Sequence, residues 1–101
     1  MMVTEELVRE ALKEVYDPEL NYNIIDLGLI YNIEVGEDGV VHLLMTLTSP
    51  GCPVGPAIVE QINESVMILP GVKDTHVELT FDPLWNPDKM SEEAKADLGI
   101  D

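Results

Sequence analysis

Two runs of alternating apolar residues flank Gly36-Glu37-Asp38-Gly39, and they constrain the fold more than any other feature of the sequence. Every second residue is apolar in 29–35 and again in 40–48, which is the period of a half-buried β-strand. Glycine and aspartate between them supply the backbone freedom of a tight turn. The pattern therefore predicts an antiparallel hairpin with one apolar face.

Helical periodicity is found on both sides of this hairpin. Residues 4–15 place their apolar side chains on one side, with Thr4 as the N-cap, and Asp17-Pro18 ends the segment because a residue before proline avoids the α region. A second helical pattern runs over 57–69 and ends at Pro70-Gly71. The sequence therefore predicts one helix before the hairpin and one after it.

A third strand over 72–81 and a short tail helix N-capped by Ser91 complete the order α-β-β-α-β-α, and 19–27 is expected to be a loop. A helix between the second and third strands predicts a right-handed parallel crossover. We therefore expect an α+β fold, a two-layer α/β sandwich on a small mixed three-stranded sheet. The length of 101 residues suits one domain, so we expect a single domain over 1–101.

The charge balance excludes several classes of partner. The chain has 5 Lys and Arg against 20 Asp and Glu, a formal net charge of -15. Phosphate backbones and anionic membranes both attract basic proteins, so we expect neither a nucleic-acid nor a membrane partner. The sequence shows no signal peptide and no bilayer-spanning apolar run, so a cytoplasmic location is expected. The acidic surface either keeps the chain soluble or selects a basic partner.

Cys52 is the only cysteine, which excludes an intramolecular disulfide and any metal site built from several cysteines of one chain. It lies between a predicted strand and a predicted helix, where unpaired N–H groups favour the thiolate. Pro53 is expected in the first helical turn, and Gly51 lets a ligand or backbone approach closely. A buried structural cysteine is the alternative interpretation, because free cysteine packs as a small hydrophobe.

Acidic residues lie in the loop after the first helix. Asp17, Glu19 and Asp26 are close in sequence, so their carboxylates could ligate a metal or accept hydrogen bonds from backbone amides. Judged from the residues alone, Asp17 is predicted to be a turn-maker and Asp26 a local cap.

Three further side chains are functional candidates. Trp85 stands between two prolines and is predicted to be either a lid on the core or a contact for a partner. His42 and His76 are predicted to be ordinary strand residues rather than catalytic bases.

Four motifs, in this order, closely resemble the metal–sulfur cluster biosynthesis family, also called domain of unknown function 59. They are Asp-Pro-Glu-Leu at 17–20, the segment 24–31, Thr-Leu-Thr-Ser-Pro-Gly-Cys-Pro at 46–53, and Thr-Phe-Asp-Pro at 80–83 with Trp85. The family includes SufT-like proteins and the PaaD-like proteins of phenylacetate oxygenase operons. The resemblance implies an auxiliary factor in iron–sulfur cluster assembly or transfer rather than an enzyme.

Carried over position by position, the resemblance implies that Cys52 is the functional thiol and a metal ligand. Asp17 and Glu19 would be the acidic positions of the first motif, Thr48 the hydroxyl before the cysteine, and Trp85 the signature aromatic of the tail.

The chain departs from the family pattern at two places. Asn21 and Asn23 stand where a glycine and an aspartate are common, which weakens the case for several carboxylates on a metal. PaaD-like proteins commonly carry an additional cysteine-rich region, and none is present here. The resemblance therefore favours the SufT-like branch.

We expect Cys52 to bind iron or an iron–sulfur cluster transiently, beside a functional loop that comprises Asp17, Glu19, Asp26, Thr48, Gly51 and Pro53. Because a cluster generally needs about four ligands, the others are expected from the second chain of a homodimer or from a client apo-protein. The expected partners are client apo-proteins and the iron–sulfur assembly machinery. Two alternatives stay open: a thiol enzyme that uses Cys52 and a histidine, and an acidic, PaaD-like adaptor subunit of a multicomponent oxygenase.

Overall fold

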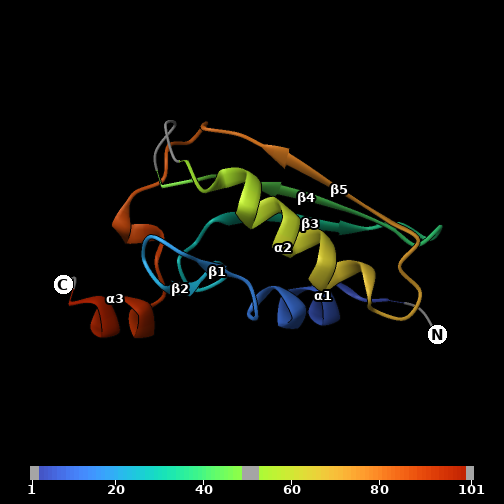
Figure 1. The fold of residues 1–101 in the computed structure, drawn as a ribbon, viewed down its shortest axis with the longest axis horizontal. Helices are drawn as coiled ribbons and strands as arrows, with labels where there is room; N and C mark the ends of the chain where they lie inside the picture. The colour runs from blue at the N-terminus through green and yellow to red at the C-terminus, as the bar shows by residue number, and fades with distance from the viewer. Residues whose placement is uncertain (1–2, 49–52, 100–101) are drawn as a thin grey trace.

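The computed structural model describes residues 3–48 and 53–99 of the chain (Figure 1). Its elements in chain order are α1 (Glu5–Leu12), β1 (Tyr16–Asp17), β2 (Tyr22–Asn23), β3 (Ile30–Val35), β4 (Val40–Met45), α2 (Gly55–Met67), β5 (Asp74–Leu79), the 3-10 helix η1 (Pro87–Lys89) and α3 (Glu92–Leu98).

A mixed sheet of three strands forms one layer of the molecule. Its order is β3-β4-β5, with β3 and β4 antiparallel across the hairpin and β4 and β5 parallel. The α2 helix joins the two parallel strands, which confirms the predicted parallel crossover. The predicted hairpin and the α+β class are confirmed as well.

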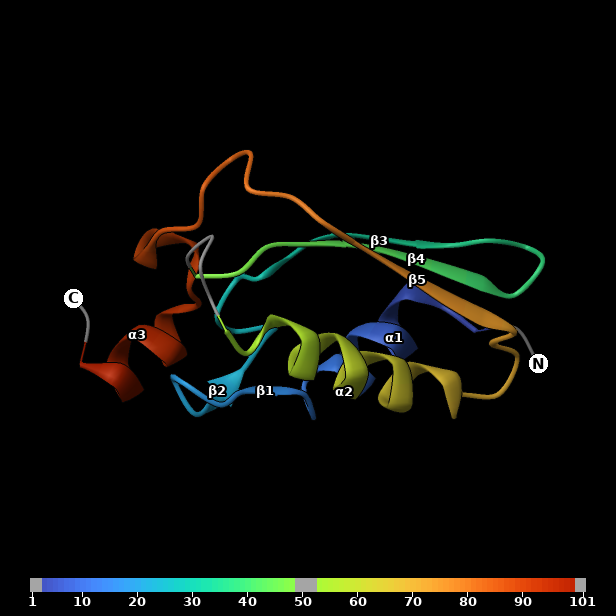
Figure 2. The same ribbon diagram turned by 45° about the horizontal axis from the view of Figure 1, so that its top comes forward.

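The other layer consists of α1 and α2, which pack against each other and against the sheet (Figure 2). The α1 helix contacts β3 and the α2 helix contacts β5, so both helices cover the same face of the sheet. β1, β2 and α3 lie together beyond one end of the sheet in both views.

The core lies between the two layers and follows the predicted periodicities. Val41, Leu43, Met45 and Leu47 are each at most 5% exposed, so alternate residues of this segment face the helices. The helices contribute the fully buried side chains Val8, Leu12, Ile58, Ile62 and Val66. Complete burial of a side chain of this size stabilises the fold by about 1.5–3 kcal/mol.

Both predicted N-caps are confirmed. The Thr4 hydroxyl accepts a hydrogen bond from the Leu7 N–H at 3.2 Å, and the Ser91 hydroxyl accepts one from the Ala94 N–H at 3.1 Å. The α1 helix ends at Leu12 rather than at residue 15. Beyond it, the Val15 carbonyl accepts a hydrogen bond from the N–H of Ile24, so this part of the chain pairs with a later segment.

The prediction that 19–27 is entirely loop is wrong, because β2 lies within it. Tyr16 pairs with Asn23 and Asp17 with Tyr22, which makes a two-residue antiparallel ladder. Strands this short are below the length at which alternation can be recognised. β4 and β5 also end earlier than the predicted ranges 40–48 and 72–81. Within the described ranges, no helix has the length and apolar character to cross a bilayer.

Candidate functional site

The Asp17 carboxylate makes the turn between β1 and β2. Its Oδ1 accepts hydrogen bonds from the N–H groups of Glu19 at 2.8 Å and Leu20 at 3.4 Å, so the predicted turn-making role is confirmed. The side chain is completely buried, and its Oδ2 has no hydrogen-bond partner among the described residues. Glu19 is exposed at the tip of the same turn. As far as residues 3–48 and 53–99 show, the turn thus holds one buried carboxyl oxygen without a hydrogen-bond partner.

Asn21 closes this turn with φ at 55°, in the left-handed region. Its N–H donates to the Asp17 carbonyl at 2.7 Å. Asparagine enters this region more readily than other residues with a Cβ, which explains how this chain forms the turn without glycine.

The Asp17 turn is held beside α2. The side-chain amide of Gln61, in the second turn of α2, donates to the Tyr16 carbonyl at 3.3 Å. At the start of the same helix, a Cβ added to Gly55 would lie 2.9 Å from Leu47 Cδ1. Glycine at 55 therefore lets the helix start pack directly on the segment that follows β4.

Thr48 and Pro53 are the described neighbours of the predicted cysteine site, and Gly51 and Cys52 lie outside the described residues. Thr48 is half-buried, and Pro53 is exposed. The expectation that Pro53 occupies the first helical turn is wrong. The α2 helix begins at Gly55, with Pro56 in its first turn, and proline is suited to that position because its missing N–H would have no helical partner.

Asp26 forms a local turn with Asn23, and it also accepts a hydrogen bond from the tail of the domain, residues 83–91. The Asn23 amide donates to Asp26 Oδ2 at 2.8 Å while Asn23 Oδ1 accepts the Asp26 N–H at 2.9 Å, so Asn23 caps this turn and the prediction that Asp26 is the local cap is wrong. The Asp26 carbonyl accepts the Ser91 N–H at 2.8 Å. One residue further on, the Trp85 indole N–H donates to the Leu27 carbonyl at 2.7 Å.

The tail continues along the same loop. Gly28 has φ at +78°, and a Cβ there would overlap the Lys89 carbonyl, so only glycine fits this approach. The Tyr31 hydroxyl donates to the Pro83 carbonyl at 2.9 Å, and Lys89 Nζ lies 5.1 Å from the centre of the Tyr31 ring. The tail from Pro83 to Ser91 is therefore fastened to 26–31. Trp85 packs on the core, and its role as a partner contact stays a prediction.

Tyr22 joins this end of the molecule to α3. Its hydroxyl donates to Asp97 Oδ2 at 2.7 Å. Because that hydrogen bond and the carboxylate charge both favour the neutral phenol, the pKa of Tyr22 is raised to about 12.

The candidate residues form two clusters. The Asp17 turn, with Glu19, lies beside α2, while Asp26 and Trp85 belong to the contact between the loop and the tail. Among residues 3–48 and 53–99, no group of three or more His, Cys, Asp and Glu side chains is arranged to hold a metal ion.

Sequence reasoning missed the residues that fasten the tail. Ser91 was predicted only as a helix cap, yet its N–H also reaches Asp26, and Tyr31 was predicted only as a strand residue. These bonds join distant segments, and no local pattern signals them. The Asn23–Asp26 pair has a local signal, because asparagine three residues before an acidic residue is a common helical-turn start.

Comparison with known proteins decides the family. Residues 5–79 match the family model described as "Iron-sulfur cluster assembly protein". The chain belongs to this family. It is 51% identical over 97 residues to the Fe-S protein maturation auxiliary factor of Porphyromonas gingivalis, with 96% of this chain and 92% of the relative covered.

Other members of the iron–sulfur cluster assembly protein family agree. The Fe-S protein maturation auxiliary factor SufT of Staphylococcus aureus is 44% identical over 86 residues, which are 85% of this chain and 98% of that protein. The crystal structure of the domain of unknown function DUF59 from Bacillus anthracis superimposes with a TM-score of 0.91 at 35% identity, covering 96% of this chain and 92% of that one. The predicted SufT-like resemblance and the fold class are confirmed.

Proposed function

We propose that this protein is an auxiliary factor that helps to assemble iron–sulfur clusters or to transfer them to client apo-proteins. The observation that carries the proposal is family membership over residues 5–79, which span the single cysteine of the chain. Two relatives named as Fe-S protein maturation auxiliary factors, at 51% and 44% identity, support the same role. These names describe helpers rather than catalysts, so we propose a carrier or assembly factor and not an enzyme.

Cys52 is the residue that we assign to the cluster. A thiolate is a soft ligand that suits iron–sulfur clusters, and the cluster is here the cargo of the protein. In the sequence, Cys52 lies between the segment that follows β4 and helix α2. Leu47, in that segment, packs on Gly55 at the start of α2. The described residues on the two sides of the proposed site, Leu47 and Gly55, are therefore packed against each other.

Cys52 supplies one cluster ligand, so the other ligands have to come from groups other than cysteines of this chain. The sequence holds one cysteine, and the described residues form no three-ligand group of their own. Because a cluster generally needs about four ligands, we propose that a second copy of the chain or a client apo-protein supplies the others. A shared, transient site is suited to transfer, since the client completes the ligand set as it accepts the cargo.

Asp17 is proposed as a positioning residue in this function. Its Oδ1 fixes the turn that bears Glu19, and the Gln61–Tyr16 hydrogen bond holds that turn beside α2. The thiol-enzyme alternative has less support, because His42 and His76 lie exposed on the sheet face opposite the helices.

The proposal is tested by maturation of a client iron–sulfur enzyme in cells that lack the protein. Cys52→Ser is expected to abolish restoration of client activity, with unchanged circular dichroism. A matched control moves the thiol: Met67→Cys in the Cys52→Ser background keeps one cysteine on an exposed position of α2. This double variant is also expected to fail. Full restoration by Cys52→Ser would contradict the role of the thiol.

A further inference from the structure

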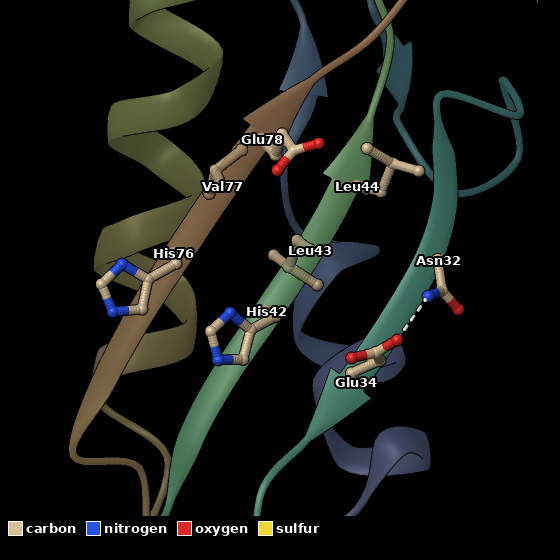
Figure 3. A pocket seen from close by; sticks show the side chains of 8 residues that line it. All are labelled: Asn32, Glu34, His42, Leu43, Leu44, His76, Val77 and Glu78. Carbon is tan, nitrogen blue, oxygen red and sulfur yellow. Dashed lines mark hydrogen bonds between the residues drawn. The ribbon is translucent and has the colours of Figure 1, made fainter. Parts of the chain in front are cut away.

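The face of the sheet that points away from α1 and α2 carries a shallow groove. Its volume is about 530 Å³, and we call it the outer-face groove (Figure 3). Its lining comes from all three strands: Asn32, Glu34, His42, Leu43, Leu44, His76, Val77 and Glu78. No helix of the described residues contacts this side, because α1 and α2 both cover the opposite face.

Strand register aligns the polar side chains of the groove into a row. Glu34 is paired with His42 across the antiparallel strands, and His42 is paired with His76 across the parallel ones. The two imidazole rings are stacked, with centroids 5.2 Å apart and planes 18° apart. Asp74 Oδ2 lies 3.2 Å from His76 Nε2. Glu34, whose Oε1 accepts a hydrogen bond from the Asn32 amide at 3.1 Å, is therefore the neighbour of His42 in this row, and the Asp74 carboxylate lies beside His76.

The outer-face groove carries acidic side chains and no lysine or arginine. Glu34 and Glu78 are exposed, and no lysine or arginine is among the residues that line the groove. All five basic side chains are elsewhere: Arg9 and Lys13 form ion pairs on α1, Lys73 lies beside the hairpin turn, Lys89 lies over Tyr31, and Lys95 is in α3. The overall charge of -15 adds to the negative potential at this face.

We propose that the outer-face groove docks a basic segment of a partner protein, with arginine preferred over lysine. A guanidinium group binds a carboxylate through two parallel hydrogen bonds and also stacks on flat rings, and the groove presents both features. A second copy of the chain is a poorer occupant, because two surfaces of the same strong negative charge repel each other. The proposal does not depend on Cys52, so it can fail while the proposed function stands.

The test measures binding of fluorescent octa-arginine and octa-lysine peptides to the intact protein by anisotropy. The groove variant is Glu34→Gln with Glu78→Gln. Its matched control is Glu60→Gln with Glu64→Gln, which removes the same charge from exposed positions of α2 in the helix layer. The groove variant is expected to weaken octa-arginine binding about five-fold, the effect of losing two exposed ion pairs, while the control changes it by less than about two-fold.

Three outcomes would overturn the proposal. Equal losses in both double variants would show that the peptide follows overall charge rather than the groove. Equal affinity for octa-lysine and octa-arginine would refute the arginine preference. Self-association that only the groove variant alters, seen by sedimentation, would assign the face to a second copy of the chain. Amide shift changes confined to β3, β4 and β5 on adding octa-arginine would support the proposal.

Discussion

Trp85 donates its indole N–H to the main-chain carbonyl of Leu27 at 2.7 Å, and so joins two segments 58 residues apart. The bond is one of several that fasten the tail to the loop before β3, together with the Ser91 N–H on the Asp26 carbonyl. These contacts make the tail a structural part of the domain. They also predict which substitutions in the tail and the loop reduce stability.

Trp85→Phe is expected to lower the free energy of unfolding by about 1–2 kcal/mol, because the ring is retained approximately while the Leu27 carbonyl loses its donor. Urea unfolding followed by far-ultraviolet circular dichroism measures the change, since Trp85 is the only tryptophan and its fluorescence is lost. The control is Leu84→Ala at a neighbouring side chain that is 62% exposed, where a change below about 0.5 kcal/mol is expected. Equal effects would contradict the assigned hydrogen bond.

Alanine substitutions at two glycines with similar φ angles distinguish the cost of a left-handed backbone from the cost of a steric overlap. Gly28 and Gly99 have φ of +78° and +74°, but a Cβ would strike the Lys89 carbonyl only at Gly28. Gly99→Ala is expected to cost about 1–2 kcal/mol, the penalty for the left-handed conformation. Gly28→Ala is expected to cost clearly more in the same thermal or urea unfolding experiment. Similar losses at both positions would show that the tail does not press on Gly28.

Substitutions at Asp17 test its role in the turn. Asp17→Ala removes the acceptor of the Glu19 and Leu20 N–H groups and is expected to cost about 2 kcal/mol. Asp17→Asn keeps one oxygen as the acceptor, so a smaller loss in urea unfolding is expected. An asparagine variant as unstable as the alanine variant would mean that the carboxylate charge, rather than its hydrogen-bonding oxygen, holds the turn.

The Tyr22–Asp97 hydrogen bond predicts an alkaline dependence of stability. The pKa of Tyr22 is raised to about 12, above the ordinary value near 10, so the bond contributes fully below about pH 10 and is lost as the pH rises through about 12. In a spectrophotometric titration, Tyr22 is therefore expected to ionise in a late step near pH 12. Asp97→Asn is expected to bring that late step down toward the ordinary value. An unchanged titration would exclude Asp97 as its cause.

The parts of the fold that were predictable from the sequence depend on local chemistry. Thr4 and Ser91 each bond a backbone N–H three residues ahead, and such caps are visible in a short window of sequence. The buried row of Val41, Leu43 and Met45 follows from a strict alternation. The helices and the hairpin follow from these signals together.

The parts that were not predictable depend on pairing between distant segments. The Trp85–Leu27 bond and the overlap of Gly28 with Lys89 exist only once the tail has folded back. The stacking of His42 on His76 results from the register of two parallel strands, which the sequence leaves open, so the histidines were expected to be ordinary strand residues. The turn that Asp17 makes was predictable from the sequence, but the complete burial of its carboxylate was not.

The central claim, that the Cys52 thiolate binds the cluster, is tested most directly by anaerobic reconstitution with iron, sulfide and a small thiol that completes the ligand set. Wild-type protein is expected to retain iron and visible cluster absorption through gel filtration, and Cys52→Ser is expected to retain neither. Equal cluster absorption in the two proteins, or none in the wild type, would contradict the claim.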